Sequence, residues 1–482
     1  MTLKTGDEYI ASLKKLGLEA QILGKKTGDP QEHPVVAPSV RAVAATFDCA
    51  HSEESRALFR VRSSLTGEEI NRFTHLHQSA QDLIDKVLMQ RYCGNVTSCC
   101  FQRCVGLDAA NAVFSVTYEC DQAHATDYHR RFRDYWAHVQ SNDLVVDGAM
   151  TDPKGERGKR PKEQRDPDLY LRVVERKSDG VVVRGAKLHQ TGMLNSHEII
   201  VMPTINMRPG EEEWAVCFAV PTTTPGIRYI YGRQASDTRK LEEPPFDIGN
   251  LRFGGQEVMT VFDDVFVPEE RIFLNGEVDQ VGKLVERFAA YHRQSYGGCK
   301  VGVGDVLIGA TALIARMNGV ENAAHIRDKL VEMVHLNETM FSSGIACSAL
   351  GHPTAAGNYE IDMLLANVCK LNVTRFPYEI ARLATDIAGG LLGTMPSAKD
   401  LDDPVSGAYI RKYLAAAEGT DVTDRMKVLR LIENLVAGAG AVGYLIESMH
   451  GAGPPAAQRI MIGRQGDIEG KIGLAKRLLD IA

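Results

Sequence analysis

Three thiols cluster in the stretch SCCFQRC, residues 98–104. Thiolates can pair as disulfides, act as nucleophiles or bind a metal, and free cysteine is also among the residue types most often buried in a core. If the stretch is helical, Cys100 and Cys104 lie on one face, about 6 Å apart along the axis. A single zinc ion prefers a tighter CxxC turn, whereas an iron–sulfur cluster accepts a wider spacing. On this stretch alone, burial is favoured over metal binding.

A second stretch, YHRQSYGGCK (residues 291–300), places His292, Tyr296 and Cys299 on one helical face. A straight helix separates His292 from Cys299 by about 10 Å of rise, and we expect the glycine pair at 297–298 to bend or break it. Alone, the pattern is typical of a core histidine and a buried cysteine near a helix break. Together, the two stretches offer three thiolates and one imidazole. Imidazole holds iron less tightly than thiolate, so its iron would meet a substrate as a Lewis acid.

Two carboxylates have neighbours that favour an unusual pKa. Glu257, in FGGQEVMTVF, follows a glycine pair at the start of an expected strand, and Glu447, in ESMHGAG, follows a helix of small residues. Carboxyl groups flanked by glycine and apolar residues can be desolvated, which raises their pKa toward the range that general acid–base catalysis uses. Exposed strand and helix ends are the more common alternative for both.

Three further segments offer groups to a cofactor. His189, Gln190 and Thr191, in the polar stretch KLHQTG, can hydrogen-bond a flat heteroaromatic ring, although a polar turn between strands has the same composition. The loop 154–160 offers Lys, Arg and glycine N–H groups to phosphates, although most charged loops are only solvated. DIAGG, residues 386–390, can bring its backbone close to a ligand or can serve helix packing.

The bulk composition is that of an ordinary soluble globular protein. The 482 residues are 44% hydrophobic and 24% charged, with a formal net charge of -7. Because the charge is mild and the basic residues are dispersed, we expect no nucleic-acid partner. The N-terminus lacks the apolar core of a secretory signal, and no apolar run is long enough to span a bilayer. The ten cysteines are too sparse for a disulfide scaffold, so we expect a cytoplasmic protein with no membrane partner.

The spacing of apolar residues changes twice along the chain. Residues 1–140 carry apolar residues at helical spacing. Residues 141–275 hold short β-rich runs, with Ser178-Asp179-Gly180 as a hairpin signal. Residues 276–482 return to helical spacing. These ranges predict an α+β fold, with an N-terminal helical domain, a middle β domain built as a sandwich or barrel, and a C-terminal helical bundle.

A family resemblance is carried by ten segments: SCCFQRCVG, DGAMTDPKG, HQTG, FGGQE, RFAAYHRQSYGGCKVGVGD, HLNET, TAAGNYEID, ANVCK, DIAGG and ESMHGAG. From the N-terminus to nearly the C-terminus, the chain resembles the 4-hydroxybutyryl-CoA dehydratase family, which is also known as the vinylacetyl-CoA Δ-isomerase family. The resemblance implies an acyl-CoA dehydrogenase-like fold, related to flavin-dependent 4-hydroxyphenylacetate hydroxylases. It also implies a homotetramer with one FAD and one [4Fe-4S] cluster in each subunit.

The resemblance implies that four side chains hold the cluster: Cys100, Cys104, His292 and Cys299. The family has a single cysteine where this chain has Cys99 and Cys100, and the spacing to Cys104 selects Cys100. On a helix Cys99 would point about 100° away from Cys100, so we expect it to be a bystander. Cys93 has no assigned role.

The reaction that the resemblance implies is loss of water from 4-hydroxybutyryl-CoA to give crotonyl-CoA. The thioester acidifies only the C2 proton, and in the family one electron passes to FAD and back to make the C3 proton acidic, with no net redox change. The iron beside His292 would bind the leaving hydroxyl, and we expect His292 to act as the base at C3, leaving the iron as it does so. The other groups expected to handle protons or position the substrate are Glu257, Tyr296, Lys300, Glu447 and Gln102.

The resemblance also places FAD, near a subunit interface. The groups expected to bind it within one subunit are Met150, Thr151, Asp152, Gly155, Arg157, Gly158, His189, Gln190, Thr191 and Asn195. Those expected to reach the FAD of a neighbouring subunit are Asp386, Gly389 and Gly390.

Two other functions are open to a chain of this kind. A flavin monooxygenase of the same fold would act on a phenol and needs no cluster, so the four matching ligands argue against it. A non-catalytic protein stapled by a metal would not need the acids, tyrosine and lysine that surround those ligands.

Overall fold

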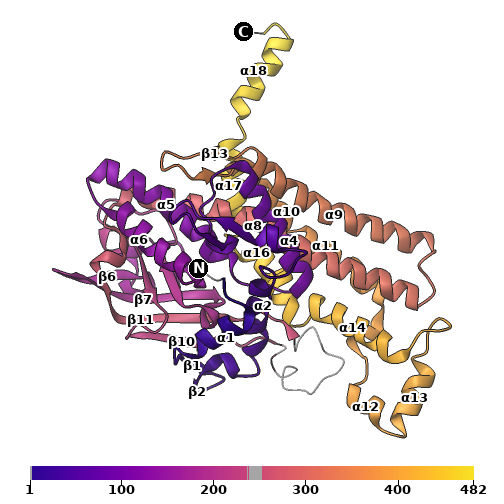
Figure 1. Ribbon diagram of the computed structural model, residues 1–482. Coiled ribbons are helices and arrows are strands. Elements are labelled where there is room, and N and C mark those ends of the chain that lie inside the picture. Colours follow the sequence, from indigo (N-terminus) through magenta and orange to yellow (C-terminus); the bar gives the residue numbers. More distant parts are fainter. Residues whose placement is uncertain (1–2, 236, 238–251, 482) are drawn as a thin grey trace.

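The computed structural model describes residues 3–235, 237 and 252–481. Helices from the first third of the chain lie against the sheets of the middle third, and long helices of the last third run beside both (Figure 1). This order of helical, β and helical segments agrees with the expected α+β fold.

The N-terminal third is mainly helical. Its longest helices are α4 and α5, and α5 begins at the last cysteine of SCCFQRC. The helices are α1 (Gly6–Lys14), α2 (Ala37–Asp48), α3 (Arg56–Phe59), α4 (Ala80–Thr97), α5 (Cys104–His124) and α6 (Tyr128–Ser141). The strands are β1 (Glu19–Ile22), β2 (Lys25–Gly28), β3 (Arg60–Arg62) and β4 (Glu69–Asn71).

The middle third forms two sheets, in the orders β2-β1-β10-β11-β7-β6 and β12-β9-β8-β5. Phe218 and Phe262, from β9 and β11, meet edge to face with centroids 6.0 Å apart, so side chains of the two sheets share one core. The hairpin expected at Ser178-Asp179-Gly180 is confirmed, because Lys177 pairs with Gly180 across a two-residue turn. The strands are β5 (Val146–Ala149), β6 (Arg172–Lys177), β7 (Gly180–Thr191), β8 (Glu198–Val201), β9 (Val216–Pro221), β10 (Ile227–Tyr231), β11 (Glu257–Pro268) and β12 (Ile272–Asn275).

Two strands of the larger sheet come from the N-terminal third. β1 pairs in parallel with β10, with Gln21 opposite Ile230, and β2 forms the outer edge beside β1. These two strands carry no clear sequence signal, because EAQI and KKTG are too short and too polar to show a period.

The last third is a bundle built around α8, the longest helix. Its principal members are α8 (Val278–Met317), α9 (Ala324–Ala349), α10 (Met363–Val373), α11 (Phe376–Ala388) and α14 (Val422–Val436). The shorter helices are α12 (Ala398–Asp402), α13 (Ser406–Tyr413), α15 (Ala439–Ala441), α16 (Glu447–His450), α17 (Pro455–Gln465) and α18 (Ile468–Leu478), and β13 (His352–Pro353) pairs with β14 (Tyr359–Glu360).

Glycines let α8 lie unusually close to its neighbours. A Cβ at Gly298 would lie 2.5 Å from the carbonyl oxygen of Val87 in α4, and one at Gly302 would lie 2.1 Å from that of Arg91. Because α8 runs without interruption from Val278 to Met317, the helix break expected at Gly297-Gly298 is wrong. The glycine pair serves close helix packing instead.

Two stretches, Val278–Met317 and Val422–His450, are long and apolar enough to cross a membrane by length and composition. In α8, 67% of the most apolar window is buried inside the protein, which is the composition and burial of a core helix. Unlike the buried helix α8, α18 projects from the rest of the protein and ends near the C-terminus (Figure 1).

Candidate active site

The thiol stretch is a loop between two helices, and α5 starts only at its end. Ser98 and Gln102 have positive φ angles, 47° and 65°, which no helix accommodates. The helical spacing assumed for Cys100 and Cys104 is therefore wrong: Cys100 lies in the loop, and Cys104 is the first residue of α5. Cys99 is buried, and its Sγ lies 3.6 Å from the carbonyl oxygen of Cys100.

Cys100, Cys104 and Cys299 converge from the loop, α5 and α8. All three are free thiols, and burial, the largest cause, raises the pKa of each, that of Cys299 to about 11. The pKa of Cys100 is raised further by the charges of Cys104 and Cys299, so the three sulfurs share one buried region.

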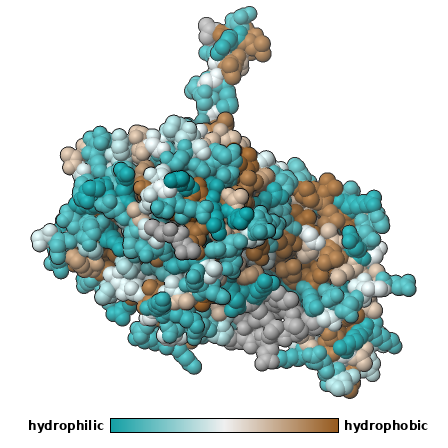
Figure 2. Space-filling model, viewed as in Figure 1, coloured by the Kyte–Doolittle hydropathy of each residue, from teal (hydrophilic) through white to brown (hydrophobic). Residues whose placement is uncertain are grey.

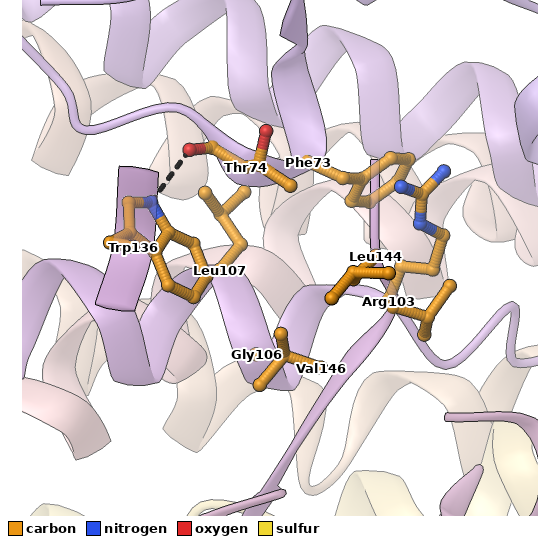
Figure 3. A pocket seen from close by; sticks show the side chains of 9 residues that line it. Phe73, Thr74, Arg103, Gly106, Leu107, Trp136, Leu144 and Val146 are labelled. Atoms are coloured by element: carbon orange, nitrogen blue, oxygen red, sulfur yellow. Dashed lines mark hydrogen bonds between the residues drawn. The ribbon is translucent and has the colours of Figure 1, made fainter. Parts of the chain in front are cut away.

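A cation clamp holds the start of α5. The guanidinium of Arg103 stacks between Phe47 and Phe73, 4.0 Å and 4.5 Å from the ring centroids. Figure 3 shows Arg103 beside Phe73 at a small cavity of about 10 Å³, room for about one water molecule. This packing fixes the residue immediately before Cys104.

His292 lies on α8, between two rings. Phe288 stacks on its imidazole with centroids 5.7 Å apart, and the edge of Tyr296 meets it at 5.2 Å. Its Nδ1 lies 2.8 Å from Oδ2 of Asp108, a residue that follows Cys104 by one turn of α5. The imidazole of His292 and the thiols of Cys104 and Cys299 thus lie on α5 and α8, while Cys100 lies in the loop that leads into α5.

Three free thiols and one imidazole are the donor chemistry that an iron–sulfur cluster takes. Among the described residues, no group of three or more His, Cys, Asp or Glu side chains is placed to hold a metal ion. A cluster of four irons spans more space than a single ion, so its ligands need not lie close enough together to hold one ion. The three thiols and the imidazole fit such a cluster by their donor types.

Carboxylates and a lysine lie beside the thiols. Lys300 donates to Oε2 of Glu447 at 2.7 Å and to the carbonyl oxygen of Gly443 at 2.6 Å. Burial lowers the pKa of Lys300, but the charges of Glu447 and the thiols outweigh it and hold the pKa well above its usual value. Glu447 follows a π-helical turn, Val442–Ile446, of the kind often found at functional sites.

Glu257 completes an acid pair with Glu447. Burial, then the charge of Glu447, raises the pKa of Glu257 well above its usual value, while the hydroxyl of Thr191 donates to its two oxygens at 2.9 and 2.8 Å. The buried Oε1 of Glu447 has no hydrogen-bond partner within the described part of the chain. Two ionised carboxylates have no proton to donate to each other. One proton shared by the pair would account both for the raised pKa of Glu257 and for the missing partner of Glu447 Oε1.

Tyr296 lies between two ammonium groups. Nζ of Lys300 is 5.1 Å and Nζ of Lys370 is 4.6 Å from the centroid of its ring. A Cβ at Gly451 would lie 1.8 Å from its hydroxyl oxygen, so ESMHGAG supplies the space that this phenol needs. Burial, then the charge of Lys300, lowers the pKa of Lys370 to about 7. No role was predicted for Lys370, although ANVCK, which contains it, was one of the ten segments.

Gln102 links the thiol loop to the β part of the chain. Its amide nitrogen donates to the carbonyl oxygens of Cys100 at 3.1 Å and Gly254 at 3.3 Å, and its oxygen accepts from Asn195 at 2.8 Å. Asn195 is itself fully buried and bonded to Ser39. Both side chains therefore brace the loop.

The groups expected to bind FAD fall into two places. The backbone N–H of Leu188 donates to the carbonyl oxygen of Thr151, which brings Met150, Thr151 and Asp152 to the end of β7, where His189, Gln190 and Thr191 lie. The carboxylate of Asp152 is buried and paired with Lys187 at 2.8 Å, so it shapes this loop, while Gly155, Arg157 and Gly158 are exposed. Asp386, Gly389 and Gly390 lie elsewhere, at the end of α11, where Asp386 pairs with Lys329 at 2.6 Å (Figure 1).

Comparison with known proteins shows the family to which this chain belongs. The family models described as 4-hydroxyphenylacetate 3-hydroxylase N terminal and C terminal match residues 5–274 and 281–480. The chain is 57% identical to a 4-hydroxybutyryl-CoA dehydratase/vinylacetyl-CoA-Δ-isomerase of Clostridium aminobutyricum, over 99% of this chain and 100% of that protein.

Solved structures agree. An oxygen-tolerant archaeal 4-hydroxybutyryl-CoA dehydratase from N. maritimus matches with a TM-score of 0.97 and 52% identity, covering 100% of this chain and 96% of that one. The fold alone is shared with an FAD complex of the oxygenase component of 4-hydroxyphenylacetate 3-monooxygenase (TM-score 0.88, 24% identity, 99% and 98% covered). It is shared more distantly with glutaryl-CoA dehydrogenase (TM-score 0.53, 12% identity, 95% and 93% covered).

Proposed function

The chain belongs to the 4-hydroxyphenylacetate 3-hydroxylase family and, within it, to the 4-hydroxybutyryl-CoA dehydratases/vinylacetyl-CoA isomerases, and we propose on this premise how its residues serve that chemistry. It is an enzyme that removes water from 4-hydroxybutyryl-CoA and isomerises vinylacetyl-CoA. The observation that carries the proposal is the convergence of three free thiols, two of them buried and that of Cys100 partly buried, with the pair Glu257 and Glu447. A phenol hydroxylase of the same fold needs no such thiols.

The residues that would hold a [4Fe-4S] cluster are Cys100, Cys104, Cys299 and His292. FAD would lie where the 150–152 loop meets the end of β7, and the homotetramer would bring the end of α11 to the FAD of a neighbouring subunit. When bound, the cluster supplies a Lewis-acid iron for the substrate hydroxyl, and FAD supplies one-electron chemistry. The FAD-bound structures of the shared fold support the flavin, and the donor set supports the cluster.

The chain's own groups handle the protons. The thioester acidifies the C2 proton, and the Glu447 carboxylate, which accepts a hydrogen bond from Lys300 at 2.7 Å, would accept it. Burial and then the charge of Glu447 raise the pKa of Glu257 well above its usual value, which favours the protonated form of this carboxyl. His292 is the base for the C3 proton, which the thioester leaves unactivated, and its imidazole would leave the iron as it accepts that proton. Tyr296 positions the hydroxyl that leaves.

Burial of these groups also excludes water. Tyr296 is 3% and Lys300 is 3% exposed. In such a site each charge interacts more strongly than in water, and the abstracted protons stay within the protein.

An anaerobic purification followed by two assays tests the proposal. The protein is expected to contain iron, acid-labile sulfide and flavin, and to convert both 4-hydroxybutyryl-CoA and vinylacetyl-CoA to crotonyl-CoA. Active protein without iron and sulfide would overturn the cluster, and activity on neither thioester would overturn the function. Oxygen-dependent hydroxylation of a phenol would identify a monooxygenase instead.

A further inference from the structure

Asp108 is a buried carboxylate that joins three helices at His292. It is 0% exposed, and its Oδ2 accepts a hydrogen bond from Nδ1 of His292 at 2.8 Å and from the hydroxyl of Ser295 at 2.9 Å. Its Oδ1 pairs with Nζ of Lys86, from α4, at 2.5 Å. A carboxylate can only accept, so Nδ1 of His292 carries a proton, and in the neutral imidazole Nε2 is then the nitrogen with the free lone pair.

Lys86 makes the carboxylate stay charged and in place. Lys86 is fully buried, and its three donors reach Asp108, the carbonyl oxygen of Tyr291 at 3.1 Å and Oε1 of Gln294 at 2.9 Å. This ion pair with a fully buried lysine favours the ionised form of the Asp108 carboxyl. Both oxygens of Asp108 and all three donors of Lys86 therefore have partners, which restricts the position of the carboxylate.

We propose that Asp108 is the positioning residue for His292, and that it presents Nε2 of the imidazole as the nitrogen that binds iron. The proposal rests on the cluster ligation proposed above. Asp108 lies one turn after Cys104 on α5, and His292 lies two turns before Cys299 on α8. The hydrogen bond between Asp108 and His292 therefore fixes the position of the ligand on α5 relative to the two ligands on α8. Partners of this kind fix the tautomer and the ring orientation of metal-binding histidines.

Phe288 and Tyr296 cannot replace this bond. Stacking and edge contacts restrict the plane of the His292 ring, but they act alike on its two nitrogens. Only a charged acceptor at Nδ1 distinguishes them.

The first test uses the wild-type enzyme, purified anaerobically with ¹⁵N-labelled histidine. Electron–nuclear double resonance of the reduced cluster is expected to show strong coupling to Nε2, with a proton retained on Nδ1. Coupling to Nδ1 would overturn the proposal, because that nitrogen is then not bonded to Asp108. This measurement needs no variant to fold.

The second test compares Asp108→Asn with Asp305→Asn. Asp305 also links α4 to α8, through Arg91 at 2.8 and 2.9 Å, but does not contact His292. The Asp108 variant is expected to keep its flavin and to bind iron about 10–100-fold more weakly in a chelator competition, with an altered histidine coupling. The Asp305 variant is expected to match the wild type in both.

Equal iron affinity and equal coupling in Asp108→Asn and the wild type would overturn the positioning role. If the wild-type enzyme itself contains no iron, the proposed cluster has failed rather than the role of Asp108. The two failures are thus distinguishable from the same preparations.

Discussion

At the scale of single residues, Cys99 and Cys100 are chemically identical neighbours in different surroundings. Cys100 interacts with the thiols of Cys104 and Cys299 and with Glu447, and Gly443 leaves room for it, since a Cβ there would lie 3.2 Å from that of Cys100. The thiol of Cys99 approaches a backbone carbonyl instead. The order of the two residues in the loop therefore decides which one can be a ligand.

Cys100→Ala is expected to lose the cluster, whereas Cys99→Ala is expected to keep it. The measurement is iron and acid-labile sulfide per subunit after anaerobic purification, with flavin content as the control for folding. Iron loss in Cys99→Ala, with full retention in Cys100→Ala, would show that the neighbour is the ligand.

Asp147 makes stability depend on pH. It is 1% exposed on β5, burial raises its pKa to about 7, and its Oδ2 has no hydrogen-bond partner among the described residues. The unfolded chain releases this proton near pH 4 and the folded protein near pH 7, so stability falls as pH rises between these values. The loss is at most about 4 kcal/mol, from a shift of about three pKa units.

Asp147→Asn is expected to remove this loss, because the amide carries no charge at any pH and can still accept from the N–H of Gly148. The difference in Tm between variant and wild type should be small at pH 4.5 and favour the variant at pH 7.5. A difference in Tm that does not change with pH would contradict the assignment.

The surroundings of Asp108 and Lys370 could not be predicted from the sequence. The cysteines, His292 and the two glutamates were found from residue type and motif. An aspartate one turn into a helix gives no such indication, because its burial depends on how α4, α5 and α8 pack. Lys370 stood in a recognised segment, but its place over Tyr296 appears only when α10 meets α8.

At the scale of elements, close packing of α4 against α8 fixes the helix that carries two of the proposed cluster ligands, His292 and Cys299. Glycine in a helix is normally unfavourable, and in α8 it is retained at the points nearest the backbone of α4. Helical periodicity correctly identified the helix but not the reason for its glycines, since a one-dimensional pattern does not contain the neighbouring helix. For the same reason the loop at Cys100 was taken as helical.

Gly302→Ala is expected to lower the Tm by several degrees and to reduce iron content, because its Cβ would lie 2.1 Å from a carbonyl oxygen of α4. Gly309→Ala on the same helix is the matched control, since a Cβ there would meet nothing within 4 Å. That variant should be neutral, or stabilised by up to about 1 kcal/mol. Destabilisation of both variants to the same extent would contradict the packing role.

At the scale of the whole molecule, α18 is a helix without a core of its own. Ile468, Leu474 and Leu478 are 59%, 59% and 86% exposed, and Figure 2 shows apolar atoms along one side of this projection. A helix of this length is marginal alone in water. The proposed homotetramer supplies a surface on which its apolar side can be buried.

A chain ending at Gly466 is therefore expected to associate more weakly than the full chain, as is Leu478→Asp. The measurement is molar mass by light scattering across a dilution series, with Glu469→Gln on the polar side as the control. Unchanged association of the truncated chain would exclude α18 from the subunit contacts.

The pairing of β1 with β10 also has a consequence during synthesis. About 200 residues separate the two strands, so at about 5–20 residues per second the ribosome needs about 10–40 s to deliver the partner of β1. Throughout that time the edge of β1 that will pair with β10 stays open, while β2 covers the opposite edge of β1. The N-terminal hairpin is thus the first segment of the larger sheet to be translated and among the last to find its place.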